Sequence, residues 1–343
     1  MRLSSSRSTA ILHRPQQDFL LWDKAGTRPS LDQQFADRKD LIDTISGQQL
    51  ITHTRASAGT YRGSDGLIKT ATTNEARFDH DPVTGESLGL LVEELRSNLL
   101  LNSGTLATQD VTVTAVAHTL SFYGSGTVTL SGTHTATVVG TGAYPARTTL
   151  TFTPTAGTLT VTVSGAVEYA NLEIGSFATS YIPTTGSTAS RSADVVSITG
   201  ANFSSWIDLN DGTFFSDSEV IVPDVQTQVT WSLTGGTYVT SLRQPQGAGS
   251  QFRAQIGNVF TSAPGTGNLL SDGTTKACVA YSGTAGRLQV GSSSNDVTSA
   301  GVLDATDLYI GSLAGGTPLN GTMRRLVYWD QRLPNDTLET ITQ

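Results

Sequence analysis

The chain has 343 residues and a formal net charge of −8, with 37% hydrophobic residues, 15% charged residues and 35 glycines. The negative charge argues against a nucleic-acid partner, and the lack of an apolar run of about 20 residues argues against membrane insertion. This length can bury two or three cores, and a composition rich in Gly, Ser and Thr is typical of all-β modules.

Residues 1–30 form a polar arm that cannot build a core by itself. Its one apolar cluster consists of Phe19, Leu20, Leu21 and Trp22. Such arms usually become ordered by packing on a neighbour, and a tryptophan has enough area to fill a partner's pocket. Two interpretations are open for the arm, a loose tail and an attachment segment. We predict that residues 1–30 attach the protein to a larger assembly through this apolar cluster.

Residues 31–103 are the most charged part of the chain, and we predict that they form a mixed docking and connector segment. Residues 64–66 (SDG) favour a turn. The run 88–94 has leucines at helical spacing, but Gly85, Gly89 and the neighbouring β-rich sequence favour a strand.

The same segment contains the one group of acidic and basic side chains that suggests catalysis: Asp79, His80, Asp81, Glu93 and Glu94. Glycosidases place two carboxyl groups about 5–9.5 Å apart across the substrate. In a strand, Glu93 and Glu94 point to opposite faces, and the two aspartates suit a role in closing a turn. We therefore interpret the group as a hydrogen-bonded corner of the scaffold, and we predict no catalytic residue and no enzymatic activity.

Two antiparallel β-sandwiches are predicted in the rest of the chain. Over residues 104–190, apolar residues alternate with threonines, and glycine-containing turns recur about every ten residues. A Ser/Thr/Gly-rich connector at 184–190 leads to a second module at 191–343, which we expect to fold separately. Its strands are predicted at 212–215, 219–222, 228–231, 276–281, 287–290, 307–311 and 321–329, and a short helix at 333–341.

No metal or cofactor site is predicted. Three histidines in strand-like runs lack the clustering that a metal needs: His53, His118 and His134. Asp208, Asn210 and Asp211 lack a complete calcium loop and favour a turn, which leaves calcium binding open. Cys278 lies in an apolar run and is predicted to be a buried thiol.

Three aromatic residues are candidates for a glycan-binding site: Trp206, Trp231 and Tyr238. Their flat apolar faces suit stacking on sugar rings. The alternative is that they belong to the core, as such residues often do in a thin sandwich.

Two sets of motifs resemble segments of tailed-phage virion proteins. A recurring cassette of those proteins is similar to 55–61 (RASAGTY), 77–82 (RFDHDP) and 89–94 (GLLVEE). The closing strand and exit of their carbohydrate-binding-module-like sandwich resemble 171–183 (NLEIGSFATSYIP) and 191–194 (RSAD). In addition, 308–311 (LYIG) and 319–326 (LNGTMRRL) are similar to the end of a concanavalin A-like, or laminin-G-like, lectin sandwich.

The resemblance implies an all-β fold of two jelly-roll or lectin-like sandwiches. It also implies a phage virion structural protein, a fibre or spike on the particle surface that attaches to the host surface or its glycans. The partners implied are other virion proteins (portal, tail, capsid or adaptor), further copies of the chain, with a trimer favoured, and a host-surface polysaccharide.

Two alternatives of other kinds stay open: a capsid decoration or cement protein without a ligand, and a polysaccharide depolymerase. The first residues lack an apolar stretch of signal-peptide length. We therefore expect synthesis in the host cytoplasm, release by lysis and residence in the virion.

Overall fold

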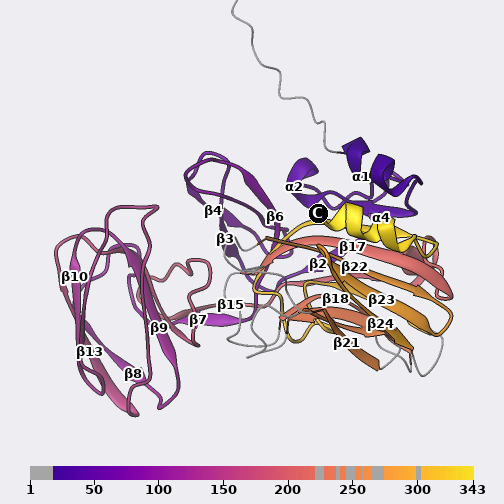
Figure 1. Cartoon of the computed structure of the whole chain (residues 1–343). Coiled ribbons are helices and arrows are strands. Elements are labelled where there is room, and N and C mark those ends of the chain that lie inside the picture. Colours follow the sequence, from indigo (N-terminus) through magenta and orange to yellow (C-terminus); the bar gives the residue numbers. More distant parts are fainter. Residues whose placement is uncertain are drawn as a thin grey trace, which may run out of the picture.

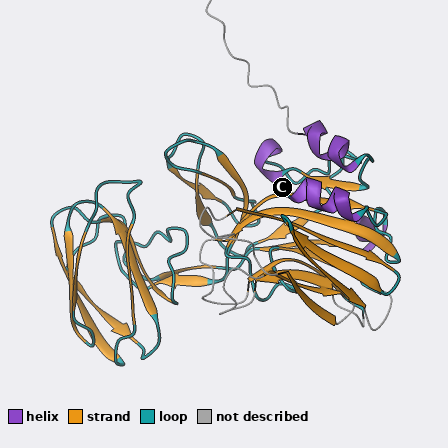
Figure 2. Cartoon of the chain, viewed as in Figure 1, coloured by secondary structure: helices purple, strands orange, loops and turns teal. Residues whose placement is uncertain are grey.

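Two antiparallel β-sandwiches of unequal size make up the protein (Figure 1). The computed structural model describes residues 18–220, 228–236, 240–244, 252–256, 259–263, 274–298 and 303–343. Most of these residues lie in strands and turns, and most of the short helices lie on one side of the large sandwich (Figure 2). The predicted all-β fold is confirmed. Within the described residues, no helix is long and apolar enough to cross a membrane.

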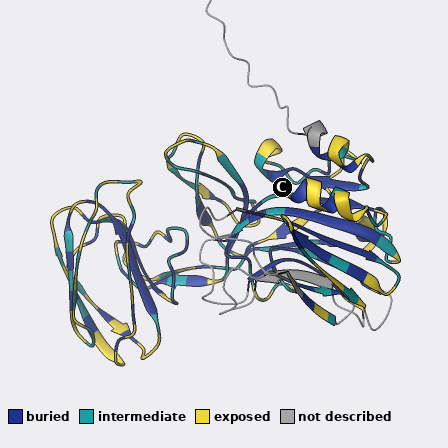
Figure 3. Cartoon of the chain, in the orientation of Figure 1, coloured by how far each residue is buried: buried dark blue, intermediate teal, exposed yellow. Residues whose placement is uncertain are grey.

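The small sandwich, residues 99–188, contains a four-stranded and a three-stranded sheet. The first has the order β11 (Ala136–Val139), β10 (Thr127–Gly132), β13 (Gly157–Ser164), β8 (Gln109–Val113), and the second β12 (Thr148–Phe152), β9 (His118–Tyr123), β14 (Glu168–Ile174). Alternate residues of each strand face inward, so that Val128 and Leu130 are fully buried whereas Thr127 and Thr129 are not. Figure 3 shows the same division between buried and exposed positions.

The large sandwich has an eight-stranded and a seven-stranded sheet. The first has the order β24 (Ser293–Thr298), β23 (Ala285–Val290), β22 (Thr274–Ser282), β17 (Asp211–Val220), β26 (Gly321–Trp329), β6 (Ser87–Val92), β5 (Phe78–His80), and β1 (Leu31–Gln33) also pairs with β26. The second has the order β2 (Thr52–Thr54), β16 (Val195–Thr199), β25 (Asp307–Ile310), β18 (Gln228–Thr234), β19 (Thr240–Gln244), β20 (Phe252–Ile256), β21 (Val259–Ala263).

The core of the large sandwich lies between these two sheets, and a second core lies under its helices. In the first, Phe214 stacks on Trp231 with ring centroids 4.3 Å apart. In the second, α1 (Asp18–Ala25) and α4 (Asn335–Thr342) cover the outer face of the eight-stranded sheet, where Cys278 and Trp329 are fully buried. The buried thiol is confirmed, and α4 confirms the predicted C-terminal helix. The remaining helices are α2 (Phe35–Arg38) and α3 (Gly200–Ser204).

The segment 31–103 is not a separate connector, which corrects the predicted domain boundaries. Strand β26 pairs with β17 along one edge and with β6 and β1 along the other, so that Gly321 lies opposite Val92 and Leu31 opposite Tyr328. Gly89 allows this approach, because its φ is +94° and a Cβ there would lie 2.1 Å from the Met323 carbonyl oxygen. The large sandwich is therefore built from the sequence before and the sequence after the small sandwich. Residues 191–343 form only part of it.

The small sandwich is an insertion whose two ends lie side by side. Strand β7 (Arg96–Asn98) leads into it, strand β15 (Ala189–Arg191) leads out, and the two pair in antiparallel register, with Asn98 opposite Ala189. Next to them, β3 (Gly59–Arg62) and β4 (Ile68–Ala71) form a hairpin that we call the lobe. In Figure 1 the lobe stands between the two sandwiches.

Candidate functional site

The acidic group of residues 79–81 holds strands together. Buried Asp79 accepts hydrogen bonds from the backbone N–H of Arg62, at 2.6 Å, and from its guanidinium. The His80 Nδ1 donates to the Arg62 carbonyl oxygen at 3.0 Å. Asp81 closes the β5–β6 turn by accepting from the Val83 and Thr84 backbone N–H groups at 2.9 and 2.7 Å. These are the contacts of the predicted scaffold corner, although Asp79 ties β5 to the lobe rather than closing a turn.

Glu93 belongs to a buried group of ionic side chains that we call the junction cluster: His53, Arg55, Arg77, Glu93, Arg191 and Asp194. Each of these side chains is at most 1% exposed. Arg77 pairs with both carboxylates, at 2.7 Å to Glu93 Oε2 and through its second Nη to Asp194. Arg55 Nη1 lies 2.9 Å from Asp194 Oδ1, and Arg191 Nη1 lies 3.1 Å from Glu93 Oε2.

The junction cluster fastens the small sandwich to the large one. Ser180 lies in the segment between β14 and β15 that leads out of the small sandwich, which we call the exit segment. Its backbone N–H and its hydroxyl both donate to Glu93 at 2.7 Å. Arg191 donates to the Thr179 hydroxyl at 3.1 Å, and Thr179 in turn donates to Glu173 of β14. With Glu173, three buried carboxylates face the three arginines. Each of these three carboxylates is therefore already engaged, and together the contacts hold the two sandwiches in one relation.

The two carboxylates of the cluster are held in the charged form. Burial raises the pKa of Glu93, but the Arg191 and Arg77 guanidiniums and the Ser180 hydrogen bonds outweigh burial and bring the pKa to about 2. The pKa of Asp194 is also lowered, because Arg77, His53 and Arg191 outweigh its burial. Burial lowers the pKa of Arg77, but the Asp194 and Glu93 carboxylates outweigh burial and raise it.

Acid is therefore expected to loosen the junction. The unfolded chain binds a proton at Glu93 near pH 4.5 and the folded chain only near pH 2, so protons favour unfolding between these values. We expect the Glu93 contribution, about 3 kcal/mol, to be present above pH 4.5 and to be lost as the pH falls towards 2. Urea unfolding at several pH values measures it. Glu93→Gln should flatten this dependence, and an unchanged slope in that variant would contradict the assignment.

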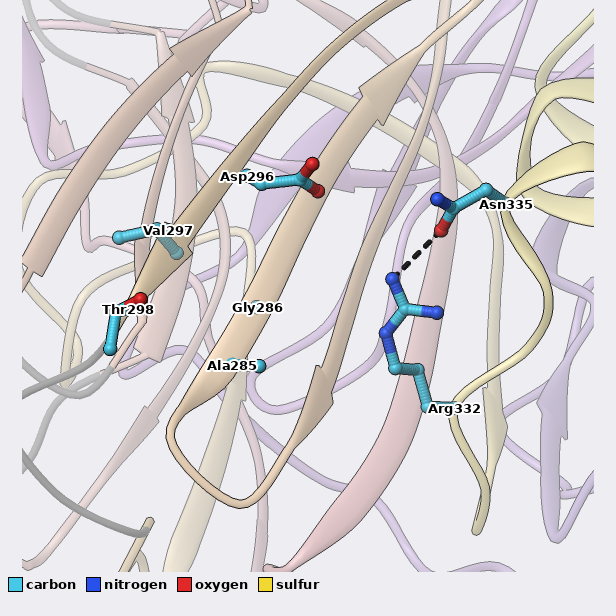
Figure 4. Close-up of a pocket in the computed structure, with 7 residues that line it drawn as sticks. All are labelled: Ala285, Gly286, Asp296, Val297, Thr298, Arg332 and Asn335. Carbon is cyan, nitrogen blue, oxygen red and sulfur yellow. Dashed lines mark hydrogen bonds between the residues drawn. The ribbon is translucent and has the colours of Figure 1, made fainter.

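A shallow pocket lies on the outer face of the large sandwich, between the start of α4 and strands β23 and β24 (Figure 4). Its volume is about 340 Å³, and its lining is Ala285, Gly286, Asp296, Val297, Thr298, Arg332 and Asn335. Arg332 donates to the Asn335 Oδ1 at 2.7 Å, and Asp296 accepts from Arg287 on the neighbouring strand at 3.0 Å. The lining offers hydrogen-bonding groups but neither an aromatic ring nor a second carboxylate, so it has no acid pair.

Two of the three residues of the predicted glycan site, Trp206 and Trp231, are core residues, which corrects the prediction for them. Trp206 is 7% exposed and meets Phe203 and Tyr328 edge to face, and Trp231 is fully buried against Phe214. Both rings fill the core of the large sandwich, where no sugar reaches them. Tyr238 lies outside the described residues.

Leu21 and Trp22 of the N-terminal arm pack on their own chain. Leu21 is buried under α4, and the Trp22 Nε1 donates to Asp32 Oδ2 at 3.0 Å. The side chains of Phe19 and Leu20 lie outside the described part of the chain. Leu21 and Trp22 therefore complete the large sandwich instead of projecting towards a partner, and attachment through the arm stays a prediction.

The candidate metal ligands serve other contacts. His53 lies in the junction cluster, and His118 and His134 both stack on Phe152. Asp208 accepts from the Asn210 backbone N–H at 2.8 Å, as expected for a turn. No group of three or more His, Cys, Asp or Glu side chains in the described ranges is arranged to hold a metal ion.

No protein-family model matches the sequence, and no curated protein matches it. The solved structures that it is similar to include carbohydrate-binding and lectin-like β-sandwich domains. One is the CBM40 module of the Ruminococcus gnavus IT-sialidase bound to α2,3-sialyllactose, with 14% identity, 39% of this chain and 82% of that chain covered, and a TM-score of 0.32.

A second is the Trypanosoma rangeli sialidase in complex with the inhibitor DANA, with 16% identity, 43% and 26% coverage and a TM-score of 0.34. A third is a heptameric SAP-like pentraxin from Limulus polyphemus, with 16% identity, 39% and 70% coverage and a TM-score of 0.30. Likeness at this level assigns neither a ligand nor an activity to the chain.

Proposed function

We propose that this chain is a structural protein of a tailed-phage particle, a fibre or spike component that holds its two sandwiches in a fixed relation and presents them to the host surface. The observation that carries the proposal is the junction cluster. Arg55, Arg77 and Glu93 come one each from the three motifs of the phage-like cassette, and Arg191 and Asp194 come from the exit motif. The residues that carry the resemblance are thus the ones that join the sandwiches.

A rigid junction suits an adhesive or structural part of a particle. Domains in one chain usually move relative to one another unless their interface is large and apolar. A buried ionic cluster is a poor source of net stability, because each charge loses its hydration, but it demands one geometry. Here the cluster holds the segment between β14 and β15 against the end of β6. The two sandwiches are therefore kept in one orientation relative to each other.

The proposal includes other virion proteins as partners and a closed homo-oligomer, with a trimer favoured. Closed symmetry is the usual state of oligomeric proteins. Host-surface polysaccharide is the proposed ligand, and the chain is proposed not to cleave it. The junction cluster supports this last point, since its carboxylates are already occupied by arginines.

Immunogold electron microscopy with antibodies raised against the purified chain tests the proposal directly. We expect gold at the surface of purified phage particles, at the tail or its base. Absence of label on particles whose capsid and tail antigens are labelled would overturn it. Label confined to the head would favour the decoration alternative, and release of reducing sugar from host polysaccharide by the purified chain would favour the depolymerase.

A further inference from the structure

Four tyrosines form a continuous row on the side of the small sandwich next to the lobe. Tyr144 lies 5.0 Å from Tyr123, Tyr123 lies 6.3 Å from Tyr169, and Tyr169 lies 5.4 Å from Tyr181, measured between ring centroids. They come from four separate segments: the β11–β12 loop, the end of β9, β14 and the exit segment. We call them the tyrosine row.

Tyr169 is held at the surface by a strained backbone. Its φ is +47°, a left-handed conformation that tyrosine seldom adopts. The pairing of β14 with β9 shifts register between Glu168 and Asn171, which marks a bulge at this position, and bulges re-aim side chains. The result is an aromatic ring that is 37% exposed. Strain of this kind persists where the surrounding structure enforces it and is concentrated at functional sites.

A small pocket opens at the Tyr181 end of the row. It has a volume of about 130 Å³. It is lined by residues 57–60 and 70, in and just before the lobe, by 181–183 between β14 and β15, and by 189–191 of β15. This lining combines an aromatic ring with the hydroxyl residues Ser57, Thr60, Thr70 and Ser190. The volume is well below that of a typical pocket for a drug-sized molecule, which suits one ring of a longer chain.

Polar groups without a partner accompany the row. The Tyr144 hydroxyl, the Arg147 Nε and the Arg191 Nε are buried and have no hydrogen-bond partner among the described residues. The Arg147 guanidinium lies 6.0 Å from the Tyr123 ring centroid, at the other end of the row from the pocket. Buried polar groups are nearly always satisfied, so the Tyr144 hydroxyl and the Arg147 Nε are the unpaired groups near the row, whereas Arg191 belongs to the junction cluster.

We propose that the exposed ring of Tyr169 and the pocket at Tyr181 form a binding face for a polysaccharide chain, with one sugar ring stacked on Tyr169 and another in the pocket; the buried Tyr123 supports Tyr169 from below. This inference rests on the proposed function, since it names the surface through which the particle meets host glycan. Aromatic rings offer the apolar faces of sugars a flat partner, although the Tyr181 hydroxyl is already hydrogen-bonded to the Ser103 hydroxyl at 2.9 Å. The ligand surface thus lies on the small sandwich, not at the predicted tryptophans of the large one.

The substitution Tyr169→Asn distinguishes a ligand-binding role of Tyr169 from a purely structural role. Asparagine adopts the left-handed region more easily than tyrosine, so the variant should melt at the same or a higher temperature than the wild type. It should nevertheless lose at least about tenfold in affinity, as loss of one stacked ring implies. Ile174→Asn is the matched control, because Ile174 lies on the same strand, is 48% exposed and is outside the row.

The measurement is surface plasmon resonance of the full chain over an immobilised panel of bacterial lipopolysaccharides and capsular polysaccharides. Binding by the wild type and by Ile174→Asn, together with its loss in Tyr169→Asn, supports the inference. Equal binding by Tyr169→Asn and the wild type overturns it. If the wild type binds no polysaccharide of the panel, the glycan face is rejected, whereas gold labelling of particles still decides the virion assignment independently.

Discussion

Asp194→Asn is expected to lower the free energy of unfolding by about 3–5 kcal/mol, the usual cost of removing one partner from a buried ion pair. Asp194 accepts from Arg55, Arg77 and the Glu93 backbone N–H in a site with no exposed side-chain surface. The amide keeps the shape of the carboxylate but leaves two guanidiniums buried beside a neutral group. The loss is therefore electrostatic and not a cavity effect.

Chemical denaturation followed by tryptophan fluorescence measures this loss. The chain's four tryptophans are Trp22, Trp206, Trp231 and Trp329, all in the large sandwich or its helix α1. Asp296→Asn is the control: it makes the same chemical change in a pair with Arg287, where the aspartate side chain is 68% exposed. Exposed pairs contribute at most about 1 kcal/mol. Similar losses in the two variants would contradict the role given to the junction cluster.

Residues 191–343 expressed alone are expected not to fold cooperatively, whereas the chain without its small sandwich is expected to fold. The fragment lacks β1 and β6, so one edge of β26 is left unpaired, and it also lacks core residues such as Leu31 and Leu90. An unpaired edge next to an incomplete core favours aggregation. In the converse deletion, a two-residue Asn-Gly turn replaces 99–188 and joins Asn98 to Ala189, which already lie opposite one another.

Size-exclusion chromatography and thermal melting distinguish the two outcomes. The deleted chain should elute as a compact species and melt in one transition, at a lower temperature than the full chain because it lacks Ser180 and its bonds to Glu93. The 191–343 fragment should elute as aggregate. A soluble fragment with a cooperative transition would show that the N-terminal strands are dispensable and that the predicted boundary was right.

The sequence predicts most strands of this fold, because alternation is a local signal. Strands such as β10 and β13 have apolar residues on one face and threonine on the other, and turns with glycine separate them. The boundaries of the large sandwich could not be predicted in the same way. Its strand β1 has three residues, all buried, and its partner in β26 lies almost three hundred positions away. No feature of the sequence near β1 predicts such a distant pairing.

The site shows the same limit. Glu93 stands out in the sequence, but the arginines that neutralise it come from distant motifs, and their burial depends on how the two sandwiches meet. Aromatic residues are ambiguous for a related reason: Trp231 looked available for a ligand and fills the core. Tyr169 gave no signal, because neither its bulge nor its left-handed backbone can be read from alternation.

The position of β26 also dictates an order of events during synthesis. It is the last strand of the chain, yet it lies inside the eight-stranded sheet, between β17 and the N-terminal strands. Chains emerge from the ribosome at about 5–20 residues per second, so β1, made near the start, waits for many seconds before its partner exists. The strands of the small sandwich find all of their pairing partners within residues 99–188 and can pair during that wait. During synthesis the small sandwich can therefore be folded while the large sandwich is still incomplete on both sides of it. The N-terminal strands of the large sandwich stay unpaired longest and depend most on chaperones that bind exposed strands.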